Sequence, residues 1–314
     1  MQNNDVVLVL NGDAADYLPY TGVAIYSLVA HFSPENNYKI YILMSNKPID
    51  ELTISLLDKI YSLTKTHSNI TIDTVDMSGT IANEMASLFY AGSYITPSAC
   101  FRLFIADVLS EYDKVLYLDC DIIARADVAM LFRTSLSGCT VGAVRDYLAY
   151  VHWLQDGSMM PRAYLAKSLG LKSAENYFNS GVLLLDLAKW RAGDITKKIV
   201  RKLSELKNPL WQDQDILNAV LSDDLLLLDN RWNATIMTPD TYEREPFIVH
   251  YNTSFKPWHN ERVFLADLWW SYAQKTPFYE DFKLKCAEKP AQKKQIEALT
   301  QKTTYDKLKS VTGR

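Results

Sequence analysis

The 314-residue chain has few cysteines and no long apolar stretch, and both absences exclude classes of protein. Its four cysteines are widely and irregularly spaced with no C-x-x-C pair, which argues against a disulfide framework or a zinc site and predicts buried, reduced thiols. The longest apolar stretches, such as 6–10 and 182–185, are far shorter than the ~20 residues of a membrane-spanning helix. No charged-then-apolar leader opens the chain, so we expect a cytoplasmic protein.

The sequence also lacks an excess of basic residues. Its 33 Lys and Arg against 37 Asp and Glu give a formal net charge of −4, so no nucleic-acid partner is expected. The charge is uneven, however, because residues 275–314 contain 10 basic and 5 acidic residues. Beside two tryptophans at 269 and 270, this basic stretch predicts either a helix that closes over the core or a peripheral contact with the anionic inner face of a membrane.

Short apolar stretches alternate with helical patterns over the first two-thirds of the chain. This alternation predicts an α/β fold with a mostly parallel central sheet flanked by helices. The predicted strands are 5–10, 38–44, 69–75, 114–118, 179–185 and 225–228. The predicted helices are 22–31, 49–64, 211–221, one that begins at Thr96-Pro97, and the chain from Asp267 onward.

Two carboxylates, Asp119 and Asp121, directly follow the predicted strand 114–118. Alternate residues of an extended chain point to the same side, and ligands of open α/β sheets bind beyond the carboxyl ends of strands. Two adjacent carboxylates repel each other unless a cation lies between them, so the pair predicts either a divalent-metal site or an ordinary acidic loop. His250 ends another apolar stretch. It is either a structural histidine or an imidazole ligand, which beside two carboxylates favours Mn(II).

Three further segments carry polar side chains suited to ligand binding. The loop after His250 offers hydroxyls, backbone amides and Lys256, a residue type that holds phosphate. Residues 179–181 (Asn-Ser-Gly) are small enough for a ligand or the backbone to approach closely. Residues 211–215 (Trp-Gln-Asp-Gln-Asp) begin a helix, where their amides and carboxylates either stabilise the positive end of the helix dipole or bind sugar hydroxyls.

Taken together, these segments resemble glycosyltransferase family 8, whose members are retaining enzymes of the GT-A fold. The nearest members are the bacterial lipopolysaccharide α-galactosyl- and α-glucosyltransferases. The resemblance covers residues ~5 to ~265 and lies in motifs that occur in family order and at family spacing. The motifs are Phe101-Arg102-Leu103-Phe104, KVLYLDCD at 114–121, YFNSGVLL at 177–184, WQDQDILN at 211–218, and the segment from His250-Tyr251 to Trp258-His259.

The resemblance implies a GT-A catalytic domain at residues 1–265, followed by a small helical, basic extension at 266–314. It implies a UDP-sugar donor, an oligosaccharide or glycolipid acceptor, and Mn(II), with Mg(II) as the alternative ion, at Asp119, Asp121 and His250. The residues that it implies in catalysis are Gln214, Asp213 and Lys256. The residues that it implies in donor binding are Asp13, Tyr17, Arg102, Asp119, Cys120, Asp146, Asn179, Ser180, Asp213, Gln214, Asn252, Thr253 and Lys256.

The predicted function is therefore transfer of galactose or glucose, with retention of configuration, in the synthesis of a lipopolysaccharide-type glycan. Because the amide of Gln214 is a poorer nucleophile than a carboxylate, attack on the face of departure is favoured over double displacement. The alternatives are a transferase for protein-linked glycans and a metal-dependent nucleotide-sugar hydrolase or nucleotidyltransferase. Acceptor-facing loops are expected at 147–174, where Tyr147, Tyr150 and Trp153 either stack a sugar ring or fill a loop.

Overall fold

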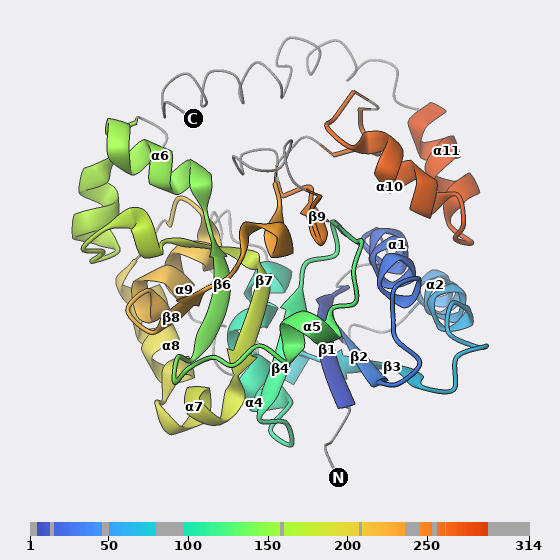
Figure 1. The fold of residues 1–314 in the computed structure, drawn as a ribbon, viewed down its shortest axis with the longest axis horizontal. Coiled ribbons are helices and arrows are strands. Elements are labelled where there is room, and N and C mark those ends of the chain that lie inside the picture. Colours follow the sequence, from blue (N-terminus) through green and yellow to red (C-terminus); the bar gives the residue numbers. More distant parts are fainter. Residues whose placement is uncertain are drawn as a thin grey trace.

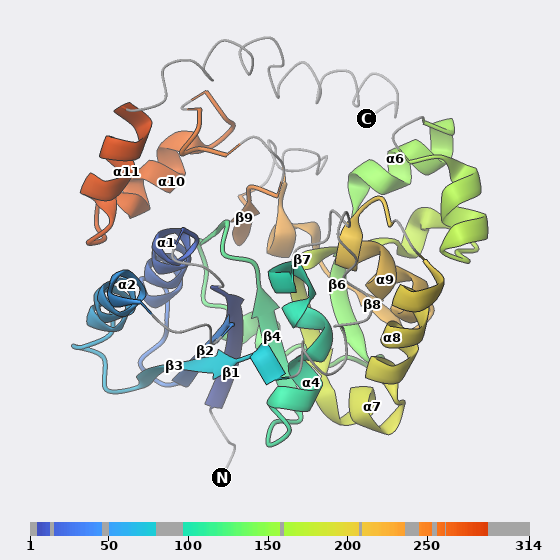
Figure 2. The same ribbon diagram turned by 180° about the vertical axis from the view of Figure 1, so that it is seen from behind.

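The structure, a computed structural model, has a seven-stranded sheet at its centre with helices on both faces (Figures 1 and 2). It describes residues 5–12, 16–45, 50–79, 97–157, 160–206, 209–235, 245–252, 256–260 and 262–287. The strands of the sheet, in spatial order, are β3 (Ile70–Asp76), β2 (Asn37–Met44), β1 (Asp5–Asn11), β4 (Lys114–Leu118), β7 (Phe178–Asp186), β6 (Val141–Arg145) and β8 (Leu225–Leu227).

Neighbouring strands of this sheet are parallel except at β7, which pairs antiparallel with both β4 and β6. A second, two-stranded antiparallel sheet joins β5 (Ile122–Ala124) to β9 (Ile248–His250). The predicted α/β class with a mostly parallel sheet flanked by helices is therefore confirmed. Because β7 runs backwards, its first residues lie at the edge where β4 and β6 end.

Helices cover the two faces of the sheet in two apolar layers. Successive strand residues point to opposite faces, so Leu8 and Leu10 of β1 pack in one layer while Val7 and Val9 pack in the other. The first layer includes α1 (Leu18–Val29), α2 (Glu51–Ser62), α5 (Ala129–Phe132), α10 (Ala266–Ala273) and α11 (Tyr279–Ala287). The second includes the 3₁₀ helix η1 (Pro97–Phe104), α4 (Ile105–Val108), α7 (Leu187–Ala192), α8 (Ile195–Glu205) and α9 (Gln212–Leu221).

A third, smaller apolar cluster lies between residues 149 and 177. The expected loops of this region are instead helical, because apolar side chains such as Leu165 and Leu169 recur at helical spacing and are buried. Its elements are α6 (Tyr147–Gln155), the π-helix η2 (Tyr164–Ser168) and the 3₁₀ helix η3 (Ala174–Asn176). Another 3₁₀ helix, η4 (Asn230–Asn233), precedes β9.

Several predicted details differ from the structure. Helix α1 begins at Leu18 and not at residue 22, because Pro19 is favourable in a first helical turn. The helix expected from Thr96-Pro97 is a 3₁₀ helix up to Phe104 and α-helical only afterwards. Of the three cysteines whose side chains are described, all are free, but only Cys100 is fully buried.

The described part of the C-terminal extension packs on the same core as the sheet. Trp269 and Phe282 are buried in the apolar layer of α1, and Gly22 of α1 leaves room for the ring of Phe278, which an added Cβ would approach to 2.2 Å. Residues 266–287 therefore close over the core. The predicted domain boundary at 265/266 stays a prediction, and so does membrane contact, since residues 288–314 lie outside the described residues. Among the described helices, none is long and apolar enough to cross a bilayer.

Candidate active site

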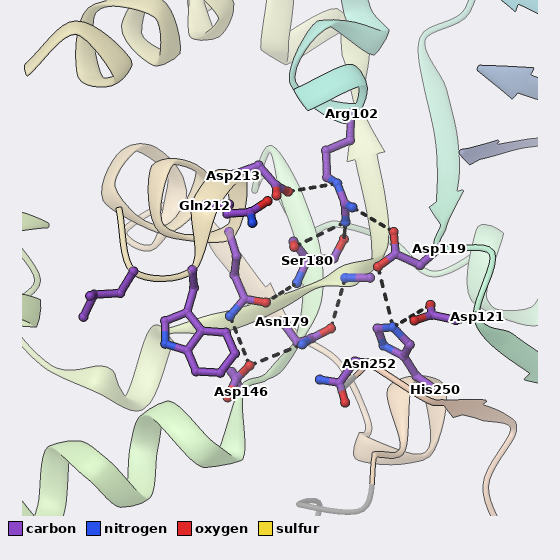
Figure 3. A pocket seen from close by; sticks show the side chains of 14 residues that line it. Arg102, Asp119, Asp121, Asp146, Asn179, Ser180, Gln212, Asp213, His250 and Asn252 are labelled. Atoms are coloured by element: carbon purple, nitrogen blue, oxygen red, sulfur yellow. Dashed lines mark hydrogen bonds and ion pairs between the residues drawn. The ribbon is translucent and has the colours of Figure 1, made fainter. Parts of the chain in front are cut away.

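A polar cleft of about 410 Å³ lies where β4 and β6 end and β7 begins (Figure 3). Ligands of open α/β sheets bind at this edge. Segments that are distant in sequence meet here: η1, the loop after β4, the residue after β6, the start of β7, the first turn of α9 and the end of β9. Its lining residues are Arg102, Asp119, Asp121, Asp146, Asn179, Ser180, Gly181, Leu210, Trp211, Gln212, Asp213, Gln214, His250 and Asn252.

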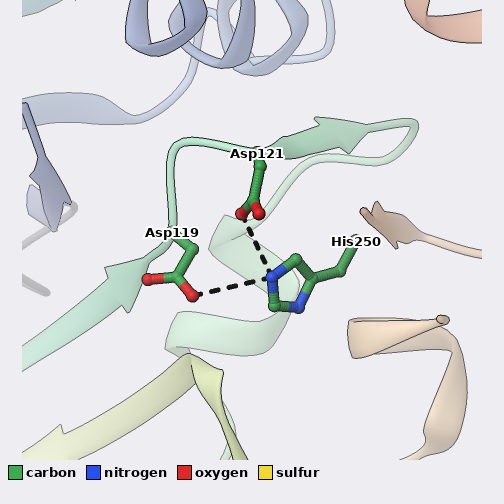
Figure 4. Close-up of side chains that lie close together, drawn as sticks. All are labelled: Asp119, Asp121 and His250. Atoms are coloured by element: carbon green, nitrogen blue, oxygen red, sulfur yellow. Dashed lines mark ion pairs between the residues drawn. The ribbon is translucent and has the colours of Figure 1, made fainter. Parts of the chain in front are cut away.

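Asp119, Asp121 and His250 converge at one end of the cleft (Figure 4). Asp119 follows β4, Asp121 precedes β5, and His250 ends β9, which pairs with β5 so that His250 lies opposite Ile122. Nε2 of His250 is 3.1 Å from Oδ1 of Asp121 and 3.5 Å from Oδ2 of Asp119. The three side chains each offer one ligand atom within 4.8 Å of the others.

The ring of His250 is oriented by a chain of amide side chains. Its Nδ1 lies 2.8 Å from Oδ1 of Asn233, whose own amide nitrogen donates to Oδ1 of Asn179. Because Asn233 presents its oxygen to the ring, Nδ1 carries a proton, and Nε2 is the nitrogen that faces the two carboxylates. Within the described part of the chain, neither His250 Nε2 nor Asp121 Oδ1 has a hydrogen bond. Such a cluster of buried, electron-rich atoms fits a divalent cation.

Lys256 lies beside this triad and contacts Oδ2 of Asp121 with its ammonium group. The same ammonium donates to the backbone oxygen of Tyr251 at 2.5 Å. Burial raises the pKa of Asp121, but the charges of Lys256 and His250 outweigh it and hold that pKa far below its ordinary value. Asp121 is therefore ionised, as a metal ligand must be.

The guanidinium of Arg102 joins the metal-binding side of the cleft to the opposite side. Its Nη2 lies 2.9 Å from Oδ1 of Asp119, and its Nε lies 2.9 Å from Oδ2 of Asp213. Its Nη1 donates to the backbone oxygen of Ser180 at 2.6 Å, and the group lies over the ring of Tyr117. Burial raises the pKa of Asp213 to about 6, although Arg102 opposes this shift.

Gln214 lines the cleft, and both its amide oxygen and its amide nitrogen are hydrogen-bonded. Its Oε1 accepts a hydrogen bond from the backbone nitrogen of Ser180 at 3.1 Å. Its Nε2 donates to Oδ2 of Asp146 at 3.1 Å and to the hydroxyl of Tyr177 at 3.2 Å. The same Asp146 oxygen accepts from Asn179 at 3.2 Å, so one carboxylate collects both amides.

Most of the residues that the sequence suggested for the site line this cleft together. Lys256 approaches the cleft from the side of Asp121. Cys120 is half-buried and does not line the cleft. Tyr17 does not line it either, because its side chain is 57% exposed and meets the ring of Tyr20 edge-on. Asp13 and Thr253 lie outside the described residues. The roles assigned to all these residues stay predictions.

Sequence reasoning missed Asn233 and gave no role to Tyr177. Asn233 is 1% exposed and reaches His250 because the adjacent Ala234 bridges Val249 of β9. No sequence motif surrounds Asn233, so only the strand register reveals its role. Tyr177 belongs to a quoted motif, but its contact with Gln214 depends on how β7 packs on α9.

Gly181 allows the metal-binding side chains to meet. A Cβ at this position would lie 2.1 Å from Cε1 of His250 and 2.8 Å from Oδ2 of Asp119. We therefore expect Gly181→Ala to separate the ligands and to weaken Mn(II) binding, measured by isothermal titration calorimetry, by about tenfold or more.

Gly142→Ala is the matched control for this variant. Gly142 pairs with Leu184 near the far end of β7, and its added Cβ would crowd Leu136 at 2.9 Å, so packing changes away from the triad. This control should bind Mn(II) like the wild type. Unchanged Mn(II) affinity in Gly181→Ala would contradict the assignment of the triad.

The raised pKa of Asp213 predicts how stability depends on pH. Folding favours the protonated carboxyl, because its pKa is about 6 in the folded chain against an ordinary 3.8. The associated stabilisation is complete below pH 3.8 and lost as the pH rises through about 6. Between pH 4 and pH 8, the wild type should therefore lose up to about 3 kcal/mol of unfolding free energy relative to Asp213→Asn.

Urea denaturation of both proteins across this pH range measures the difference. Asp223→Asn, which removes an exposed carboxylate paired with Lys172, should follow the wild-type profile. Parallel profiles for Asp213→Asn and the wild type would show that Asp213 is not held in its protonated form by burial.

Comparison with known proteins connects this geometry to a family. The model of Glycosyl transferase family 8 matches residues 7–262. Lipopolysaccharide 1,2-glucosyltransferase of Escherichia coli (strain K12) is 26% identical over 297 residues, which cover 90% of this chain and 81% of that protein. Glycosyltransferase GlyF of Streptococcus pneumoniae is 33% identical over 204 residues. The aligned region covers 61% of this chain and 46% of GlyF. The aligned region thus spans about half of GlyF.

Two solved structures share the fold. Galactosyltransferase LgtC in complex with donor and acceptor sugar analogues has a TM-score of 0.68 and 25% identity, and the match covers 87% of this chain and 96% of LgtC. The apo bifunctional glycosyltransferase WbbM has a TM-score of 0.76 and 23% identity over 89% of this chain and 51% of WbbM. The predicted GT-A fold is confirmed by these matches, and with the family model matched over residues 7–262, the chain belongs to glycosyl transferase family 8.

Proposed function

We propose that the protein is a retaining hexosyltransferase that moves galactose or glucose from a UDP-sugar to a saccharide acceptor in the synthesis of a lipopolysaccharide-type glycan. The observation that carries the proposal is the convergence of Asp119, Asp121 and His250 in one polar cleft that Gln214 also lines. A nucleoside diphosphate needs positive charge, and its sugar needs hydrogen-bonding partners. The triad would supply the positive charge through a bound cation, and the side chains around Gln214 offer the hydrogen-bonding partners.

Asp119, Asp121 and His250 would hold the cation, and their mixed oxygen and nitrogen ligands favour Mn(II), with Mg(II) as the alternative. When bound, such an ion supplies Lewis-acid charge that stabilises a leaving diphosphate. The orphaned Nε2 of His250 and Oδ1 of Asp121 support this assignment. Arg102 adds a fixed positive charge on the other side of Asp119, within the same cleft.

Lys256 would stabilise the negative charge that develops on UDP as the sugar leaves. Its ammonium lies at the edge of the triad, and charge placed beforehand where charge develops lowers the barrier. The backbone of Asn252 and Thr253 would bind the same diphosphate. At the nucleoside end, Asp13 and Tyr17 would contact uracil and ribose.

Asp213, Asn179 and Asp146 would position the donor sugar, and Gln214 would face its anomeric carbon. The amide of Gln214 is a poor nucleophile, which favours attack of the acceptor on the face from which UDP departs. Acceptor binding is assigned to helix α6, which begins directly after Asp146. Its half-buried Tyr147, Tyr150 and Trp153 would stack on a sugar ring.

The relatives support the substrate class. The Escherichia coli relative is named lipopolysaccharide 1,2-glucosyltransferase, and LgtC is named a galactosyltransferase. A hexose donor and a lipopolysaccharide-type acceptor therefore agree with both groups. The cytoplasm, where nucleotide sugars are made, is the corresponding location.

A donor screen tests the proposal. The protein is incubated with UDP-galactose, UDP-glucose, UDP-N-acetylglucosamine or UDP-N-acetylgalactosamine and a lipopolysaccharide-core oligosaccharide, and products are identified by mass spectrometry and NMR. We expect an α-linked galactose or glucose product with Mn(II) and none with EDTA. Release of free sugar without transfer would indicate a hydrolase. A β-linked product would contradict retention.

Removal of the Lys256 charge provides a second prediction. In Lys256→Met, we expect kcat to fall by about 10²- to 10³-fold, because the developing charge on UDP loses a preorganised partner. Lys172→Met, which removes an exposed surface ammonium, should retain the wild-type rate. An unchanged kcat in Lys256→Met would remove this residue from the mechanism.

A further inference from the structure

Asp215 is a fully buried carboxylate whose two oxygens both accept hydrogen bonds. Its Oδ1 accepts from the hydroxyl of Tyr177 at 2.6 Å, and its Oδ2 accepts from the hydroxyl of Tyr164 at 2.6 Å. The backbone nitrogen of Trp211 donates to Oδ2 as well, at 2.8 Å. Of the described residues, neither Asp215 nor Tyr177 lines the cleft. A carboxyl group buried beside Gln214, yet out of reach of a ligand, is costly and requires a reason.

The hydrogen-bond directions in this group follow from the chemistry of its members. Oδ1 of Asp215 accepts the hydroxyl proton of Tyr177. The lone pairs of that hydroxyl then face Gln214, which can meet them only with N–H. Asp215 thus determines that Nε2 of Gln214 faces Tyr177, and Oε1 faces the backbone nitrogen of Ser180.

Asp146 also accepts a hydrogen bond from Nε2 of Gln214, but it differs from Tyr177 in its exposure to the cleft. Asp146 lines the cleft, so sugar hydroxyls compete for its carboxylate, whereas Tyr177 is 0% exposed and beyond their reach. When a sugar occupies the cleft, Tyr177 is the partner that continues to hold the amide nitrogen.

The geometry points to Tyr177 and Asp215 as positioning residues that fix the orientation of the Gln214 amide for sugar transfer, an inference that rests on the function proposed above. Positive charge develops on the sugar as its bond to UDP breaks. An amide oxygen with a spare lone pair stabilises that charge, whereas an amide nitrogen in the same place opposes it. The relay from Asp215 through Tyr177 keeps the oxygen in place.

Kinetics of Tyr177→Phe and Asp215→Asn test this role. We expect kcat to fall by about ten- to a hundredfold in each, with the donor KM within about twofold of wild type, because orientation and not binding is lost. The matched controls are Tyr38→Phe and Asp127→Asn, which alter a second Tyr–Asp pair with a 2.9 Å hydrogen bond in which the tyrosine is also buried. The controls should lower the melting temperature similarly and leave kcat unchanged.

A double-mutant cycle separates positioning from general damage. In a Gln214→Ala background, adding Tyr177→Phe should change kcat by less than about twofold, because Tyr177 acts through the missing amide. An equal loss of kcat in both backgrounds would overturn the inference. So would a wild-type kcat in Tyr177→Phe.

A measurement without substrate distinguishes this inference from the proposed function. The Nε2 protons of Gln214 are followed by NMR in ¹⁵N-labelled protein and assigned by their disappearance in Gln214→Ala. In the wild type, both protons should exchange slowly with solvent, and in Tyr177→Phe one should exchange at least about tenfold faster. Unchanged exchange would overturn the positioning role. Accelerated exchange in a protein that transfers no sugar would support positioning and reject the proposed transferase.

Discussion

The mutual repulsion of two carboxylates held close together is the constraint on which this site depends. Asp119, Asp121 and Nε2 of His250 are brought together by elements about 130 residues apart in the chain. Each carboxylate has its own cationic partner, Arg102 for Asp119 and Lys256 for Asp121. Burying these charges is costly unless they are paired in this way. A metal ion bound here would enter a cluster in which a cationic side chain already pairs with each carboxylate.

The reversed strand β7 allows the two halves of the cleft to meet. Because β7 is antiparallel to its neighbours, its first residues, and not its last, lie at the ligand-binding edge. Asn179 and Gly181 are thereby placed between the triad and α9, where Gly181 makes room for His250. Arg102 spans the same gap and pairs with a carboxylate on either side. The electrostatics of Asp119 and Asp213, on the two sides of the cleft, are therefore coupled through one guanidinium.

The features that could be predicted from the sequence are those with a local signal. Apolar stretches located the strands because a strand buried on both faces is continuously apolar, as β1 shows. The D-x-D pair and the 211–215 turn were visible because several polar residues cluster in a few positions. The role of Asn233 was invisible, since it arises from the bridge between Ala234 and Val249. The helices of 147–177 were mistaken for loops because their apolar residues bury in a small cluster of their own.

The cleft contains groups that stability alone does not favour. Asp213 is buried with a raised pKa, and Gln212 has a left-handed φ of +49°, a conformation that costs about 1–3 kcal/mol outside glycine. The sheet beneath is packed on both faces, so it tolerates these costs and fixes the strand ends from which the cleft residues project. The paired tyrosines on Asp215 belong to the same pattern, because they satisfy a buried charge by ordering the side chains around it. The two packed apolar layers thus hold the strand ends in place, so the repelling carboxylates of Asp119 and Asp121 keep one arrangement in the cleft.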